Sequence, residues 1–270
     1  MSLILSNCTY LKHLLPNIYH AFIKSQAWVA FCFALLCKYV QLINDWNQDS
    51  LVFISFFATI FVYNFSHWIG DKASWRIPII LITVLICFGI GVLYLDFSLF
   101  IILSLLAGIS ILYSWSFNPK TLRNMPRLKI FWIALVWTLV VIMPAFSTFQ
   151  RLNNNLIWLA ISIFCFTLAI TIPFDIRDLS TDDENLKTLP QLVGIQRSIF
   201  LSLCLIFLSA FFMLTYFSYQ VDVGTRAFLM SLSFATIILL MSRNSFNKWF
   251  TTFWVEGLSA LPFVFYFILK

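Results

Sequence analysis

The chain has 270 residues, of which 61% are hydrophobic and 10% are charged, and its formal net charge is +6. Soluble globular chains are about 45–50% apolar and about 25% charged, so this composition excludes a soluble globule. The 19% of aromatic residues excludes a disordered chain. The basic residues lie singly between long apolar runs, which gives no support to nucleic-acid binding. The sequence therefore indicates an integral membrane protein.

A helix needs roughly 20 mostly apolar residues to cross the hydrocarbon core of a bilayer. Nine stretches meet this requirement: Ser25 to Ile43, Leu51 to Ile69, Ile77 to Leu95, Phe97 to Ser114, Ile130 to Phe149, Leu156 to Phe174, Ile199 to Tyr219, Phe228 to Met241 and Phe250 to Leu269. The segments between them are too short to fold as soluble domains. We therefore expect residues 1–270 to form one all-α domain, a polytopic bundle of about nine transmembrane helices.

The Lys and Arg residues divide unequally between the two sides of this expected bundle. Thirteen lie before the first span or after even-numbered spans, against four on the other side. Cytoplasmic loops carry the excess of basic residues in membrane proteins, so we expect the N-terminus and the loops after even-numbered spans to be cytoplasmic. The expected location is a bacterial inner (plasma) membrane.

The carboxylates gather in one place. There are eleven in the chain, and five of them lie between Asp175 and Glu184, after the sixth apolar stretch. Asp175, Asp178 and Asp182 are spaced i, i+3, i+7, which puts all three on one side of a helix. Converging carboxylates repel one another unless a cation neutralises them, and such oxygen ligands suit Mg²⁺ shared with substrate phosphates. A solvated acidic loop is the alternative interpretation.

A second polar cluster follows the second apolar stretch. Asn64, His67 and Asp71 have the same i, i+3, i+7 spacing, and each lies 111 residues before its counterpart in the acidic cluster. This offset has the form of an internal repeat. Ordinary interfacial polar residues at a helix end are the alternative.

The most basic loop follows the fourth apolar stretch, on the same side as both clusters. Its four basic residues are Lys120, Arg123, Arg127 and Lys129. Tyr113 precedes the loop, at the expected end of a helix. Positive-inside sorting alone can account for such a loop. A diphosphate site also requires basic groups opposite metal-bound carboxylates, because Lys or Arg neutralises the phosphate charge that Mg²⁺ leaves.

These residues resemble the UbiA superfamily of intramembrane prenyltransferases, whose members have nine membrane helices and aspartate-rich motifs in cytoplasmic loops after the second and sixth helices. The second motif matches the family pattern at Asp175, Arg177, Asp178, Asp182, Lys187, Thr188, Leu189, Pro190 and Gly194. Tyr113 and Lys129 are similar to the family's Tyr-Ser and Leu-Lys segments. The first motif is degenerate, because Asn64, His67 and Asp71 leave one carboxylate where the family has three aspartates.

The resemblance implies Mg²⁺-dependent transfer of an isoprenoid group from a prenyl diphosphate to a lipid-soluble acceptor, such as an aromatic compound, among membrane lipids. The metal ligands that it implies are Asp175, Asp178 and Asp182, which are also the catalytic residues, and Asn64 and Asp71 for a weaker second ion. The diphosphate-binding residues that it implies are Lys129, Tyr113, Arg177, Lys187 and His67. No nucleic acid and no obligate protein partner are expected.

Two other functions fit parts of the sequence. A catalytically silent relative would account for the degenerate first motif. A small-molecule transporter would place ionisable groups near the middle of the bilayer, where Glu256 and Lys38 are the candidates. Binding of a labelled isoprenoid diphosphate separates the transporter from the other two hypotheses.

Overall fold

The computed structural model describes residues 22–114, 128–146, 155–180, 186–242 and 248–270, and this part of the chain is helical without any strand. Its first half contains α2 (Ala27–Ile43), α3 (Asp49–Asp71), α4 (Arg76–Tyr94), α5 (Phe97–Ser114) and α6 (Leu128–Ile142), which a 3-10 turn at Met143–Phe146 extends. The second half contains α7 (Leu156–Arg177) with a 3-10 turn at Asp178–Ser180, α8 (Leu189–Val193), α9 (Ile195–Tyr216), α10 (Val223–Ser242), α11 (Lys248–Phe250) and α12 (Leu261–Leu269). A π-helical turn at Thr251–Val255 and a 3-10 turn at Leu258–Ala260 lie between α11 and α12.

The predicted membrane segments coincide with these helices to within a few residues. Seven of the described helices are long and apolar enough to cross a membrane, and two shorter apolar helices, Ala27–Ile43 and Phe97–Tyr113, occupy the first and fourth predicted segments. The third and fourth segments are separate helices, because α4 ends at Tyr94 and α5 begins at Phe97. The prediction of an all-α membrane bundle is therefore confirmed, with nine as an approximate count.

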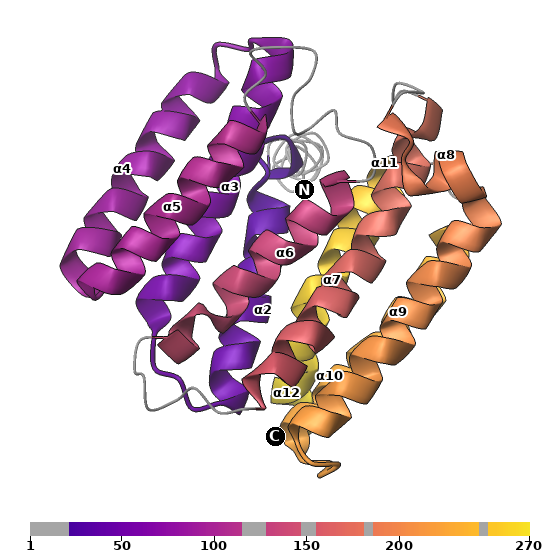
Figure 1. Cartoon of the computed structure of the whole chain (residues 1–270). Helices are drawn as coiled ribbons and strands as arrows, with labels where there is room; N and C mark the ends of the chain where they lie inside the picture. Colours follow the sequence, from indigo (N-terminus) through magenta and orange to yellow (C-terminus); the bar gives the residue numbers. More distant parts are fainter. Residues whose placement is uncertain (1–21, 115–127, 147–154, 181–185, 243–247) are drawn as a thin grey trace, which may run out of the picture.

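Helix α7 lies in the middle of the bundle. Figure 1 shows α6 and α9 on its two sides, with α4 and α5 on the far flank beyond α3. In α7, 67% of the apolar span is buried, against 11% in α4. A helix that is apolar on all sides can face lipid without cost, as α4 does, whereas the central helix is where polar groups can be shielded from lipid. Asp175 and Asp178 of the acidic cluster lie at the end of this central helix.

Small hydroxyl side chains hold α7 against α9. The Ser162 hydroxyl donates to the carbonyl of Ser209 at 2.8 Å, and the Ser209 hydroxyl donates back to the carbonyl of Ser162 at 2.8 Å. The Ser202 hydroxyl donates to the carbonyl of Ala169 at 2.7 Å. Small residues let two helices approach closely in a membrane, where helix association depends on packing and on hydrogen bonds rather than on the hydrophobic effect.

This interface leads to a prediction about stability. We expect Ser162→Ala to lower the free energy of unfolding by only about 0.6 kcal/mol, the average value of one interhelical hydrogen bond in a membrane. Ser162→Leu forces a large side chain between two closely packed helices, and we expect it to cost about 1–3 kcal/mol. Thermal unfolding in detergent compares the two variants. Ser233→Leu on the exposed face of α10 is the matched control and should unfold like the wild type.

Candidate active site

The end of α7 carries the two described carboxylates of the second motif. Asp175 lies in the last turn of the helix and is 2% exposed, and Asp178 follows the last helical residue. Helix C-termini carry a partial negative charge, so carboxylates are unfavourable there unless cations neutralise them. The sequence thus places negative charge at a helix end that repels it. A charge that destabilises the fold in this way is typical of a functional site.

Two basic side chains supply the neutralising charge. Nζ of Lys129, at the start of α6, lies 3.4 Å from Oδ1 of Asp175 and 4.0 Å from Oδ2 of Asp178. Nε and Nη2 of Arg177 donate to the two carboxylate oxygens of Asp178 at 2.7 and 2.8 Å. Lys129 is itself at a helix N-terminus, where a cation is unfavourable, so α6 and α7 compensate each other by bringing opposite charges together. The structure therefore brings together four of the predicted residues.

Next to these charges lies an apolar cavity of about 570 Å³, which we call the Asp175 cavity. Lys129 and Asp175 form its charged end, and its walls come from α6, α7, α8 and α9, with Phe131, Leu168, Ile172, Leu189 and Leu205 among the lining residues. The Lys-Thr-Leu-Pro run of the motif leads into α8, and Thr188 and Leu189 of this run line the cavity. Gln191 accepts the backbone N–H of Thr188 at 2.8 Å at the start of α8, and Gly194 adopts φ 81° where the chain turns into α9. A positive φ of this kind favours glycine.

The carboxylates at this end fit a divalent cation. Asp175 and Asp178 both lie within 4.0 Å of one ammonium nitrogen, so the ammonium of Lys129 stands where a metal ion could neutralise both. Mg²⁺ in phosphate-binding sites is often held by one or two carboxylates, with water and phosphate oxygens completing the shell. The described residues contain no group of three His, Cys, Asp or Glu side chains able to hold a metal. Asp182, the third predicted ligand, lies outside the described residues.

The other predicted diphosphate-binding residues, Tyr113, Lys187 and His67, come from three different parts of the fold. Tyr113 is buried at the end of α5, with its ring stacked on Trp132 of α6 at 5.7 Å between centroids, one turn beyond Lys129. Lys187 is exposed just before α8, with φ 45°, and none of the described carboxylates forms an ion pair with it. His67 is exposed on α3 and interacts electrostatically with Asp71. Tyr113 thus packs on α6 one turn beyond Lys129.

The first motif contains a residue whose part the sequence did not reveal. Arg76, at the start of α4, donates from Nη1 to Oδ1 of Asn64 at 2.9 Å and from Nε to Oδ2 of Asp71 at 3.1 Å. In the sequence, Arg76 is only one of the thirteen basic residues on the side that we expect to be cytoplasmic. Its separation of five residues from Asp71 is the one indication that a side chain could fold back across the turn between α3 and α4.

The two candidate residues for a transporter have different surroundings. Lys38 forms an ion pair with the exposed Asp49 beside the turn between α2 and α3, so this lysine is paired near a helix end. Glu256 follows the π-helical turn and interacts electrostatically with Arg177 and with Tyr63. Arg177 also reaches the hydroxyl of Thr252 at 3.5 Å. Glu256 therefore belongs to the surroundings of the second motif rather than to a separate polar path.

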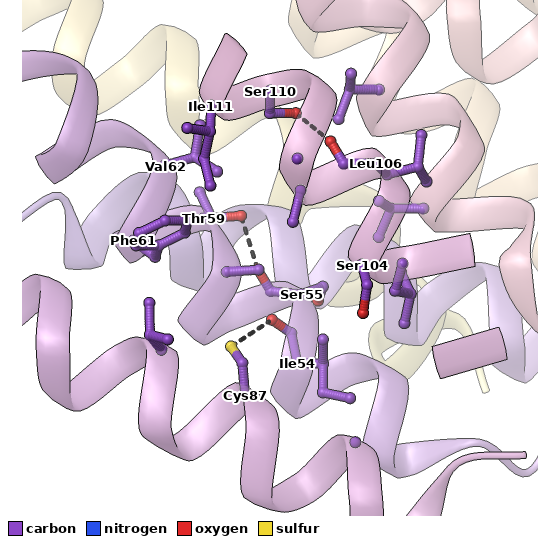
Figure 2. Close-up of a pocket in the computed structure, with 18 of the residues that line it drawn as sticks. Ile54, Ser55, Thr59, Phe61, Val62, Cys87, Ser104, Leu106, Ser110 and Ile111 are labelled. Carbon is purple, nitrogen blue, oxygen red and sulfur yellow. Dashed lines mark hydrogen bonds between the residues drawn. The ribbon is translucent and has the colours of Figure 1, made fainter. Parts of the chain in front are cut away.

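A second apolar cavity, which we call the Ser55 cavity, lies between α3, α4, α5 and α6 and measures about 390 Å³. Figure 2 shows two of its hydroxyl groups, those of Thr59 and Ser110, turned to the backbone of their own helices. Thr59 donates to the carbonyl of Ser55 at 2.7 Å and Ser110 donates to that of Leu106 at 2.8 Å. These bonds satisfy the hydroxyls, so the cavity presents an apolar surface to any occupant.

The chain matches no protein-family model and no curated protein by sequence. Its structure is similar to that of a UbiA homologue from Aeropyrum pernix K1 without ligand, with a TM-score of 0.59 and 12% identity over 89% of this chain and 96% of the other. It is also similar to a UbiA homologue from Archaeoglobus fulgidus, with a TM-score of 0.60 and 13% identity over 93% of this chain and 98% of the other. The chain therefore has, over almost its whole length, the fold of these UbiA homologues.

Proposed function

We propose that this chain is an intramembrane prenyltransferase of the UbiA superfamily, which transfers an isoprenoid group from a prenyl diphosphate to a lipid-soluble acceptor. One observation carries this function: Lys129 and Asp175 form the charged end of an otherwise apolar cavity, and Asp178 lies beside them, 4.0 Å from the ammonium of Lys129. A ligand that fits both parts has an anionic head that binds cations and an apolar tail, and a prenyl diphosphate has this form. The shared fold and the match of the second motif support the same function.

The roles of the residues follow from their charges. Asp175 and Asp178, joined by Asp182, would hold Mg²⁺, which when bound neutralises charge on the departing diphosphate. Lys129 can turn toward a phosphate oxygen once a divalent ion neutralises the carboxylates. Arg177 also has the Thr252 hydroxyl and the ring of Phe174 as partners, so it keeps contacts when it releases Asp178.

The reaction is a substitution at the first carbon of the prenyl chain. The bond between this carbon and the diphosphate oxygen breaks, and the diphosphate leaves with the electron pair. The acceptor then bonds to the allylic cation and loses a proton. The apolar walls of the Asp175 cavity keep water from capturing the cation before the acceptor does. We place this site on the cytoplasmic side of a plasma membrane, because the basic excess lies on that side of the chain.

A binding experiment tests this function. The full chain in lipid nanodiscs is mixed with radiolabelled geranyl, farnesyl and geranylgeranyl diphosphate, with Mg²⁺ or with a chelator. We expect binding that requires Mg²⁺ and release of diphosphate when a lipid extract supplies the acceptor. Binding without any release identifies a catalytically silent relative. No binding at millimolar Mg²⁺ rejects the function and leaves the transporter hypothesis.

The position of the prenyl chain leads to a second prediction. The Asp175 cavity is the one with a charged end, so we expect Cys204→Phe, which fills it from α9, to weaken geranylgeranyl diphosphate binding about tenfold and geranyl diphosphate binding much less. Gly108→Leu fills the Ser55 cavity instead, where a new side chain meets no atom within 4 Å of its Cβ. Binding constants for donors of different length compare the two variants. The opposite pattern would show that the chain lies in the Ser55 cavity.

A further inference from the structure

The guanidinium of Arg76 occupies the centre of the first motif. It lies between Oδ1 of Asn64 at 2.9 Å and Oδ2 of Asp71 at 3.1 Å, the two oxygens through which these residues would bind a metal. Arg76 is 8% exposed and Asn64 is fully buried. Two oxygen acceptors hold the buried guanidinium in place, the buried amide of Asn64 and the exposed carboxylate of Asp71, because a buried charged donor without a partner is costly.

Further hydrogen bonds fix the orientation of the two acceptors. Nδ2 of Asn64 donates to the carbonyls of Ser25 and Ile60, both at 2.9 Å. Its amide therefore cannot turn over, because the nitrogen is held by two carbonyls and the oxygen by a cation. Oδ1 of Asp71 accepts the backbone N–H of Ala73 at 2.9 Å. The amide and carboxylate oxygens of the first motif are thus directed to N–H donors.

These residues do not fit a resident Mg²⁺ ion. Mg²⁺ requires oxygens at about 2.0–2.1 Å in octahedral geometry, and Arg76 cannot lose its charge to make room for it. A divalent ion on the same two oxygens would lie within a few ångströms of the guanidinium, where like charges repel strongly. His67 does not help, because a neutral imidazole is a poor ligand for Mg²⁺.

The number of carboxylates in each motif supports the same conclusion. The second motif has five carboxylates between Asp175 and Glu184, an excess over its neighbouring basic residues that suits a divalent ion. The first motif has Asp71 as its one carboxylate, with Asn64 and His67 in the other two positions. One carboxylate balances one guanidinium. The single carboxylate of the first motif therefore suits a monovalent cation better than a divalent one.

We propose that the guanidinium of Arg76 replaces the metal ion of the first motif, so that the chain binds one divalent ion, at Asp175 and Asp178, for each prenyl diphosphate. Asn64 and Asp71 are then positioning residues that orient Arg76 toward the phosphates. The guanidinium suits this task, because it stays charged and has N–H groups left to donate to a phosphate oxygen while Asn64 and Asp71 hold it. This inference rests on the proposed function.

The location of the motif agrees with this role. Tyr63, the residue before Asn64, interacts electrostatically with Arg177 of the second motif. Figure 1 shows this end of α3 on the same side of the bundle as the end of α7, where Asp175 and Asp178 lie. Among the described residues, Nη2 of Arg76 has no hydrogen-bond partner, which leaves one terminal nitrogen for a phosphate oxygen.

Counting metal ions tests the inference without any turnover. The full chain in nanodiscs is saturated with a non-reactive prenyl thiolodiphosphate, and Mn²⁺ is titrated by calorimetry and by electron paramagnetic resonance. We expect one Mn²⁺ for each bound analogue and no coupling between two ions. Two coupled ions in the wild type would overturn the inference and leave the proposed function intact. An analogue that does not bind at any Mn²⁺ concentration would overturn the proposed function as well.

Variants of Arg76 distinguish a contact with phosphate from a purely structural link between α3 and α4. We expect Arg76→Ala to weaken analogue binding about 10–100-fold, as for loss of a hydrogen bond between charged groups, and Arg76→Lys to recover part of it. Arg226→Ala, which changes an exposed arginine in the first turn of α10, is the control and should bind like the wild type. Wild-type affinity in a folded Arg76→Ala protein would show that Arg76 only links α3 to α4 and does not contact the phosphate. If Arg76→Ala does not fold, Arg76→Lys and the wild-type ion count still decide.

Discussion

Replacing Asp178 with Asn is expected to lower prenyl transfer on the order of 10²–10³-fold, comparable with the loss of one group aimed at charge that develops in a transition state. The substitution keeps the shape of the side chain but removes the charge that would hold Mg²⁺. The half-saturating Mg²⁺ concentration should rise as well. Turnover measured against Mg²⁺ concentration in wild type and variant checks both effects.

The fold should tolerate this change. Asp178 lies beyond the last turn of α7, and its ion pair with the neighbouring Arg177 is partly exposed, so the pair contributes little to stability. Asp222→Asn is a matched control, because Asp222 accepts the backbone N–H of Thr225 at the start of α10 and an Asn can do the same. Asp222→Asn should leave turnover unchanged. Asp178→Asn with wild-type turnover would exclude Asp178 from the metal site.

The second large effect is expected from Lys129→Ala. Lys129 is the ammonium that contacts Asp175 and Asp178, and it lines the charged end of the Asp175 cavity. Its loss removes a charged contact to the diphosphate, so we expect the dissociation constant of a prenyl diphosphate to rise about 10–100-fold. Equilibrium binding of a labelled donor at saturating Mg²⁺ measures the change.

The same variant should respond more strongly to Mg²⁺ in its stability. Without Lys129, the buried carboxylate of Asp175 and that of Asp178 repel each other until a divalent ion neutralises them. Mg²⁺ should therefore raise the unfolding temperature of Lys129→Ala more than that of the wild type. Lys187→Ala should have the smaller effect on binding, since Lys187 is exposed. A larger loss in Lys187→Ala than in Lys129→Ala would contradict the arrangement at the end of α7.

The sequence alone determines the helices and the second motif. Whether a segment crosses a membrane depends on the summed transfer free energy of its own residues, so the bounds of α3, α5 and α7 follow from local composition. The i, i+3 spacing of Asp175 and Asp178 at a helix end likewise places both side chains on one side of the helix. Both kinds of information are local in the chain and need no knowledge of neighbouring helices.

Only the tertiary structure decides which residues meet. Lys129 reaches Asp175 because α6 packs beside α7, and no spacing in the sequence specifies that contact. The position of Arg76 is the clearest case, because an arginine after a membrane helix looks like any other cytoplasmic charge until its distance to Asn64 is known. Helix rotation and packing depend on side chains from several helices at once. The sequence therefore predicts a degenerate metal motif, whereas the tertiary structure shows a guanidinium between the side-chain oxygens of Asn64 and Asp71.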